Sequence, residues 1–139
     1  MTNYKEYCLC YISKKAPDTT SDVIQSIVNY SANYNAKSNI TGVLIEYETN
    51  FLQYLEGDPV IIYTLFQKIS VDERHQNVML LNFKPIDDRF FVDWNMAYRN
   101  IIDLDEQVQH ECVNSIELIK ENLEFWRGID VIEKISNLT

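Results

Sequence analysis

The sequence predicts an α+β fold in which helices cover a five-stranded mixed sheet. Apolar residues alternate with a period of two in some short segments and recur with helical periodicity in others. The two kinds of segment follow one another in the order strand, helix, strand, strand, helix, strand, strand. That order is the ferredoxin-like pattern with an extra strand, βαββαββ. A chain of 139 residues suits a single core.

The first strand is predicted over Tyr7–Ile12, which is rich in strand-forming residues. Alternation places Leu9 and Tyr11 on one face and Cys8 and Cys10 on the other. Two cysteines on one face of one strand have a poor geometry for a disulfide, and the three cysteines of the chain form no metal-binding pattern. We therefore expect reduced, packed thiols and no metal site.

The first helix is predicted to begin at Asp18 or Thr19, either of which can cap it, and to run to about Asn35. Its apolar residues recur at helical spacing and form one stripe: Val23, Ile24, Ile27, Val28 and Tyr34. Asparagines cluster around its end. Asparagine there is ordinarily a C-cap or turn residue. This interpretation is stronger for Asn39 than for Asn35.

A hairpin is predicted next, from a strand over Ile40–Glu48 and a strand over Asn50–Gly57. Gly42 in the first of these allows another backbone to approach closely. Gln53 in the second lies between large apolar residues on a face that should be buried. A buried amide left unpaired costs about 1–3 kcal/mol. Its partner could be a neighbouring side chain, water, or a ligand.

The second helix is predicted to begin after Asp58, which can cap it, with Pro59 at its first position. Its buried stripe is formed by Ile62, Leu65, Phe66 and Ile69. Positive side chains lie at its end and just beyond it, at Lys68, Arg74 and His75. The ordinary role of such residues is a favourable interaction with the helix C-terminus.

Two further strands are predicted, over 77–86 and 90–98. Side chains of the earlier strand alternate between the two faces of the sheet. One face carries Val78, Leu80 and Asn82, and the other carries Met79, Leu81 and Phe83. In the later strand Trp94 and Met96 share a face. Core packing is the ordinary role of both side chains.

Residues 103–139 are predicted to form helices that cover the second face of the sheet. Their apolar positions recur at helical spacing on either side of a break near Gly128: Val108, Cys112, Ile116, Ile119 and Leu123, then Ile129, Ile132 and Ile135. Coiled-coil pairing competes with this use, but the repeat is too short to favour it. We therefore divide the chain into residues 1–102 and a helical extension over 103–139.

Charge and hydropathy exclude some classes of partner. The net charge is −9, and residues 103–139 contribute −6 of it, with nine acids and three bases. Nucleic-acid binding needs a basic surface and is not expected. The longest apolar run is too short to span a bilayer, and the N-terminus does not resemble a signal peptide. These features predict a cytoplasmic protein that does not bind membranes.

Five short motifs lie between about residues 6 and 100. They are Tyr11-Ile12-Ser13; Asn35 with Asn39-Ile40-Thr41-Gly42; Phe51-Leu52-Gln53-Tyr54-Leu55-Glu56-Gly57; Asp72-Glu73-Arg74-His75; and Trp94-Asn95-Met96. Together they resemble the BLUF family, the blue-light sensors that use FAD. They occur in the family's order and at compatible spacing, which makes the resemblance specific.

The resemblance implies a flavin ring between the two predicted helices, with FAD as the expected cofactor and FMN or riboflavin as alternatives. It makes Tyr11 the photochemical electron and proton donor, and Gln53 the bridge between Tyr11 and the flavin. The remaining roles are carried over residue by residue: Asn35 at the polar edge of the ring; Ile27 and Ile69 on its two faces; Lys68, Arg74 and His75 at the ribityl or phosphate part; and Trp94 and Met96 relaying the state of Gln53.

The sequence departs from the family pattern at two places. Lys68 stands where members often have arginine, so a bidentate phosphate contact becomes a single point charge. Tyr34 stands where some members place a second polar residue beside the ring, which leaves its role open. Neither departure touches Tyr11 or Gln53.

No output enzyme is expected, because 37 residues after position 102 cannot hold a cyclase or phosphodiesterase domain. The resemblance is thus to short, stand-alone members that act by forming homo-oligomers or by binding a separate effector, with the acidic helices as the contact surface. Two alternatives stay open. One is a flavin-free interaction module. The other is a flavin-dependent redox enzyme, which no nucleophile–base pair supports.

Overall fold

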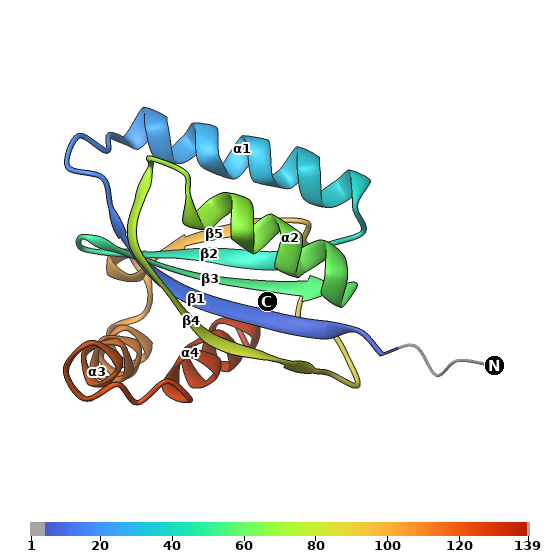
Figure 1. Cartoon of the computed structure of the whole chain (residues 1–139). Helices are drawn as coiled ribbons and strands as arrows, with labels where there is room; N and C mark the ends of the chain where they lie inside the picture. The colour runs from blue at the N-terminus through green and yellow to red at the C-terminus, as the bar shows by residue number, and fades with distance from the viewer. Residues whose placement is uncertain (1–4, 139) are drawn as a thin grey trace.

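A five-stranded sheet separates two layers of helices (Figure 1). The computed structural model describes residues 5–138, and residues 1–4 and 139 lie outside the described range. The strands are β1 (Tyr7–Lys15), β2 (Thr41–Tyr47), β3 (Asn50–Gly57), β4 (His75–Pro85) and β5 (Ala97–Asn100). The helices are α1 (Ser21–Lys37), α2 (Pro59–Ser70), the short 3-10 helix η1 (Ile101–Asp103), α3 (Glu106–Asn122) and α4 (Arg127–Ser136).

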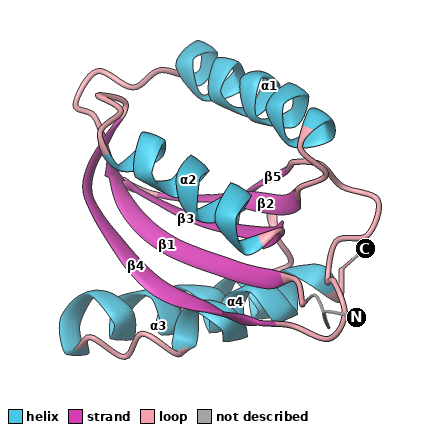
Figure 2. Ribbon diagram, turned by 45° about the vertical axis from the view of Figure 1, so that its right-hand side comes forward, coloured by secondary structure: helices cyan, strands magenta, loops and turns pink. Residues whose placement is uncertain are grey.

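The sheet has the order β4-β1-β3-β2-β5 and is mixed, because β2 and β5 are parallel while the other pairs are antiparallel. Helices α1 and α2 cover one face and α3 and α4 cover the other (Figure 2). The predicted ferredoxin-like fold with an added strand is confirmed. Each face of the central strands therefore has its own apolar layer.

Capping residues set the start of both helices in the first layer. The cap of α1 is Thr20, whose hydroxyl accepts from the backbone N–H of Val23 at 3.3 Å. Thr19 is not the cap, because its hydroxyl donates to the carbonyl of Ala16 at 2.7 Å. Asp58 caps α2 as predicted, accepting from two backbone N–H groups of the first turn.

Strand β4 departs from the predicted alternation. Its register with β1 shifts between the pairs Cys10–Asn82 and Tyr11–Leu80, so one extra residue is inserted. As a result the Phe83 ring lies 5.4 Å from the Tyr63 ring of α2, on the side predicted for Asn82. Residues Asn82 and Phe83 thus face the opposite way from the prediction, because a β-bulge interrupts the period of two.

The fifth strand begins later than predicted. It spans Ala97–Asn100 rather than 90–98, because the backbone N–H groups of Phe90 and Phe91 donate to the Glu56 carboxylate instead of to a neighbouring strand. Trp94 and Met96 consequently do not share a face. Trp94 packs in the apolar layer of α3 and α4, whereas Met96 packs in the layer of α1 and α2.

The C-terminal helices pack against the second face of the sheet, with six apolar side chains buried: Cys112, Ile116, Ile119, Val131, Ile132 and Ile135. The break between them precedes the predicted one. Leu123 ends α3 in the left-handed conformation with φ of 57° and is 57% exposed. Gly128 lies inside α4, where an added Cβ would be 3.2 Å from Cys10 Sγ, so this glycine permits close helix–sheet packing.

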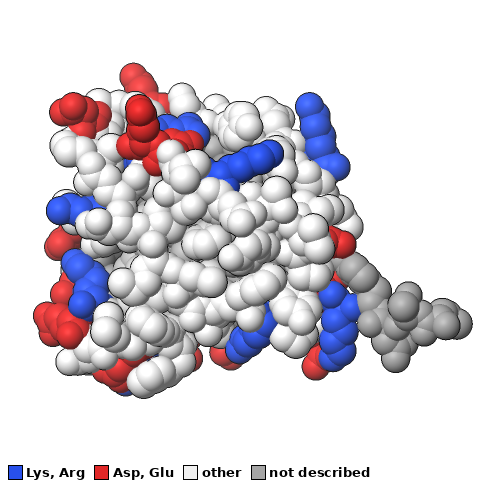
Figure 3. All heavy atoms as spheres, viewed as in Figure 1, with Lys and Arg blue, Asp and Glu red and all other residues white. Residues whose placement is uncertain are grey.

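The surface over α2 and β1 is largely uncharged, with basic and acidic side chains around its rim (Figure 3). Within residues 5–138, no helix combines the length and the apolar character needed to cross a membrane. Cys8, Cys10 and Cys112 are buried free thiols.

Candidate functional site

A pocket of about 140 Å³ lies between α1 and α2, above β3. Both helices, β3 and the segment that leads into β4 contribute to it. Its lining residues are Ile27, Tyr30, Ser31, Tyr34, Asn35, Gln53, Leu65, Lys68, Ile69, Asp72, Arg74 and His75. Every residue that the sequence assigned to the cofactor, except Tyr11, lines this one pocket.

Tyr11 lies next to Gln53 on the neighbouring strand. The two residues are opposite each other in the β1–β3 ladder, and the Tyr11 hydroxyl donates a hydrogen bond to Gln53 Oε1. Both side chains are buried. Burial raises the pKa of the Tyr11 phenol well above its ordinary value, so the phenol keeps its proton at neutral pH and acts as a donor. On its other side, Gln53 Nε2 lies 3.8 Å from Met96 Sδ.

Asn35 leaves one polar atom unsatisfied in the pocket wall. Its Nδ2 donates to the backbone carbonyl of Asn95 at 2.8 Å, but its buried Oδ1 has no partner among the described residues. A buried acceptor without a donor costs about 1–3 kcal/mol. A ligand with an N–H group at this wall would supply the donor. The residues present therefore fit a ligand that offers a hydrogen-bond donor to Asn35, as the polar edge of a flavin would.

Two cationic side chains, Lys68 and Arg74, also line the pocket. The Arg74 guanidinium forms a bidentate pair with Asp72, at 3.0 Å from Nε to Oδ1 and 2.7 Å from Nη2 to Oδ2. The Arg74 hydrogen bonds hold the pKa of the Asp72 carboxyl below its ordinary value. Lys68 Nζ lies 5.7 Å from the centroid of the Tyr34 ring, within cation–π range. Tyr34 therefore steadies Lys68 at the pocket.

His75 differs from these cations in its surroundings. It is buried, its Nδ1 lies 2.9 Å from Ser13 Oγ, and its ring lies 5.4 Å from the Phe51 ring and 6.1 Å from the Tyr11 ring. Burial lowers the pKa of His75. The lowered pKa favours the neutral form of the imidazole, so His75 lines the pocket mainly as an aromatic ring.

Four lining residues were given no role at the cofactor in the sequence analysis: Tyr30 and Ser31, which were not named, Leu65, which was named only as part of a buried stripe, and Asp72, which was named only as part of a motif. Helical spacing could have identified two of them. Ser31 lies one turn from both Ile27 and Asn35, and Leu65 lies one turn before Ile69. The pocket-facing side of each helix can thus be predicted once one of its residues is known.

The sequence model of a family described as sensors of blue-light using FAD matches residues 7–97, which is more than half of the chain. The chain belongs to the BLUF family. As a BLUF domain it is a blue-light photoreceptor, and domains of this family bind a flavin. The pocket, Tyr11 and Gln53 all lie within the matched residues.

The curated relatives are much longer proteins. The chain is 36% identical over 83 residues to the photoactivated adenylate cyclase subunit alpha of Euglena gracilis, an alignment that covers 60% of this chain and 8% of the relative. It is 30% identical over 90 residues to the subunit beta of Euglena longa, covering 64% and 10%. The BLUF domain described here thus spans a tenth or less of these relatives.

Solved structures extend the likeness to nearly the whole chain. A bacterial light-regulated adenylyl cyclase has a TM-score of 0.77 at 32% identity, covering 93% of this chain and 40% of that one. The photo-activated state of BlsA has a TM-score of 0.72 at 27% identity, covering 91% of this chain and 94% of that one. The dark-state BLUF protein BlrB has 0.80 at 24% identity, covering 99% and 100%, and shows the shared fold.

Proposed function

We propose that the pocket between α1 and α2 holds the flavin ring and that Tyr11 and Gln53 carry out the photochemistry. The observation that carries this proposal is the buried Tyr11–Gln53 hydrogen bond, whose glutamine opens into the pocket. FAD is the proposed cofactor, with FMN or riboflavin as alternatives. The unpaired Asn35 Oδ1 would accept a hydrogen bond from the ring, and Ile27 and Ile69 would cover its two faces.

The rest of the cofactor would meet the charged side chains of the lining. Lys68 and Arg74 would face the ribityl or phosphate part, Lys68 as a point charge. Arg74 is already paired with Asp72, which fixes its guanidinium and offsets part of its charge. His75 would contribute a neutral ring rather than a third cation.

The flavin, when bound, absorbs the blue light. Tyr11 would supply an electron and its phenolic proton to the excited flavin, and both would return to Tyr11 afterwards. Before light the proton is bound to the Tyr11 oxygen, which donates it in a hydrogen bond to Gln53 Oε1. An amide has an acceptor end and a donor end of similar size, so it can exchange them at little steric cost. Gln53 then settles into a different hydrogen-bonding pattern, by rotation or by tautomerisation. The result is a changed set of contacts around Gln53.

An absorption spectrum of the purified protein, recorded before and after blue light, tests the proposal. We expect flavin bands that shift slightly to the red in blue light and return in the dark. A protein that stays colourless after incubation with FAD would favour the flavin-free module. Steady turnover of NADH would favour the redox enzyme. Both results would contradict the sensor mechanism.

The signal must be amplified beyond the pocket. One altered neutral hydrogen bond is worth about 0.5–1.5 kcal/mol, whereas moving a two-state equilibrium from 1:99 to 99:1 needs roughly 5.5 kcal/mol. Met96 contacts Gln53 on one face of the sheet, and Trp94, two residues earlier, packs on the other face with the layer of α3 and α4. We therefore infer a relay from Gln53 through Met96 and Trp94 to the C-terminal helices.

Replacing Trp94 by alanine is expected to keep the light-induced red shift and to remove the effect of light on α3 and α4. The Trp94 ring stacks on Phe91 at 5.7 Å and lies 4.8 Å from the Arg99 guanidinium, contacts that alanine cannot make. Hydrogen exchange of residues 106–136 in the dark and in light measures the effect. Val92→Ala is the control, because Val92 lies in the same segment and is 71% exposed.

A Trp94→Ala protein with a complete photocycle and an undiminished light response of α3 and α4 would refute this relay.

In the proposed organisation, residues 1–102 form the sensor and 103–139 form the extension that presents the acidic surface. That surface would contact a second copy of the chain or a separate protein effector. The chain itself would act as a sensor rather than as an enzyme.

A further inference from the structure

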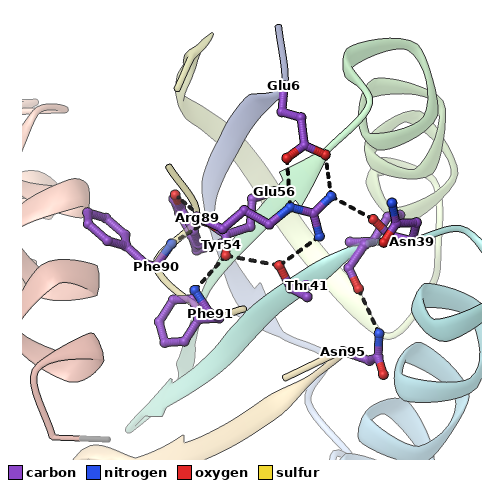
Figure 4. A network of polar contacts seen from close by, with 10 residues as sticks. Glu6, Asn39, Thr41, Tyr54, Glu56, Arg89, Phe90, Phe91 and Asn95 are labelled. Atoms are coloured by element: carbon purple, nitrogen blue, oxygen red, sulfur yellow. Dashed lines mark hydrogen bonds and ion pairs between the residues drawn. The ribbon is translucent and has the colours of Figure 1, made fainter. Parts of the chain in front are cut away.

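Glu56 is a fully buried carboxylate at the end of β3 (Figure 4). Alternation along the strand places it on the face of the sheet opposite to Gln53. Its Oε1 accepts from the Thr41 hydroxyl at 2.9 Å and from the Phe91 backbone N–H at 2.6 Å. Its Oε2 accepts from the Tyr54 hydroxyl at 3.0 Å and from the Phe90 backbone N–H at 2.9 Å. Four donors from three separate segments therefore converge on one side chain.

Arg89 reinforces this cluster from outside. Its guanidinium donates to the Thr41 hydroxyl oxygen at 3.2 Å and to the Asn39 carbonyl at 2.9 Å, and its Nε donates to Glu6 at 2.8 Å (Figure 4). The Thr41 hydroxyl thus accepts from Arg89 and donates to Glu56. The start of the segment 89–96 is tied to the beginnings of β1 and β2 and to the end of β3.

The other end of the same segment reaches the proposed photochemical site. The Trp94 carbonyl accepts from the Gly42 N–H at 2.9 Å, and the Asn95 amide donates to the Ile40 carbonyl at 3.1 Å. The Asn95 carbonyl in turn accepts from Asn35 Nδ2. Met96 follows directly and meets Gln53. The segment is therefore bonded to Glu56 at its start. At its end, Asn95 and Met96 contact two pocket residues, Asn35 and Gln53.

We propose that Glu56 is a positioning residue for the photochemical site: by holding the N–H groups of Phe90 and Phe91, it sets how firmly Met96 rests on Gln53. This inference depends on the proposed function of Tyr11 and Gln53. A carboxylate can accept at both oxygens, which the two N–H groups and two hydroxyls require. An amide cannot, because one of its ends is a donor.

The test is the rate at which the flavin-loaded protein returns to its dark spectrum after a blue flash. In Glu56→Gln, the amide NH₂ must face one of the two backbone N–H groups, and the segment loosens. Gln53 then reverses more easily, and we expect recovery roughly threefold to tenfold faster, the factor that one lost hydrogen bond is worth. A rate within about twofold of the wild type would overturn the proposal.

A double-mutant comparison separates positioning from general weakening. If Glu56 acts through Met96, then Glu56→Gln changes the recovery rate by less than about twofold in a Met96→Ala background. The same acceleration in both backgrounds would overturn the proposal, because it would show that Met96 is not the route.

Thr41 provides a milder pair of variants, which carries the test where Glu56→Gln does not fold. Thr41→Val removes the hydroxyl that joins Arg89 to Glu56, while Thr41→Ser keeps it. We expect faster recovery in the valine variant only, and equal rates in the two variants would overturn the proposal. Wild-type protein without a reversible shift would instead contradict the proposed function. If the wild-type protein shows a reversible shift and the Glu56 and Thr41 variants recover at the wild-type rate, only the role of Glu56 is contradicted.

Discussion

Replacing Gln53 by leucine is expected to abolish the light-induced red shift while the flavin stays bound. Leucine has a similar volume but neither donor nor acceptor, so the amide that changes its bonding pattern is gone. The buried Tyr11 hydroxyl also loses its acceptor, at a cost of about 1–3 kcal/mol. The difference spectrum after blue light and the ratio of flavin to protein measure the two effects.

Gln67→Leu is the matched control for this change. Gln67 is exposed on α2 and does not line the pocket, so its variant should keep the full shift. A Gln53→Leu protein that binds flavin and still shows the wild-type red shift would remove Gln53 from the mechanism. Loss of the flavin itself would show that Gln53 is needed mainly for binding.

Replacing Gly42 by alanine is expected to destabilise the fold strongly. An added Cβ would lie 2.1 Å from the backbone oxygen of Tyr54, in the ladder between β2 and β3. Ordinary contacts to a Cβ begin near 3.4 Å, so two central strands would have to separate. We expect a loss of at least about 3 kcal/mol in the free energy of unfolding. Urea unfolding followed by circular dichroism measures it.

Gly128→Ala is the control for the same chemical change. Its added Cβ would lie 3.0 Å from Leu81 Cδ1 and 3.2 Å from Cys10 Sγ, which are side-chain atoms that can shift. The expected loss is below about 2 kcal/mol. Equal stability of the two variants would show that the β2–β3 ladder adapts more easily than its geometry indicates.

Local periodicity was enough to predict the fold, whereas the pocket residues were expected from the resemblance to the BLUF family. Alternation in β3 places Gln53 among buried apolar residues, and the structure has it there. The cap at Asp58 and the helical stripe that includes Ile69 fix the start and the orientation of α2. These features depend on residues close together in the chain, and for that reason the sequence predicts them.

Features set by contacts between distant segments could not be predicted in this way. The late start of β5 depends on Glu56, which takes backbone donors 34 and 35 residues further along the chain. The opposite faces of Trp94 and Met96 follow from the same contact. The bulge in β4 is equally non-local, because it exists only relative to β1. No periodicity within either segment contains this information.

The irregular pairing of β4 also bears on how copies of the chain can assemble. β4 is an edge strand of 11 residues, long enough to recruit a strand from another molecule. Its bulge, and the left-handed Asn77 with φ of 51°, break the even row of amide and carbonyl groups that such recruitment needs. The opposite edge, β5, has only four residues. Growth into continuous intermolecular sheets, the first step of fibrous aggregation, is therefore disfavoured at both edges of the sheet.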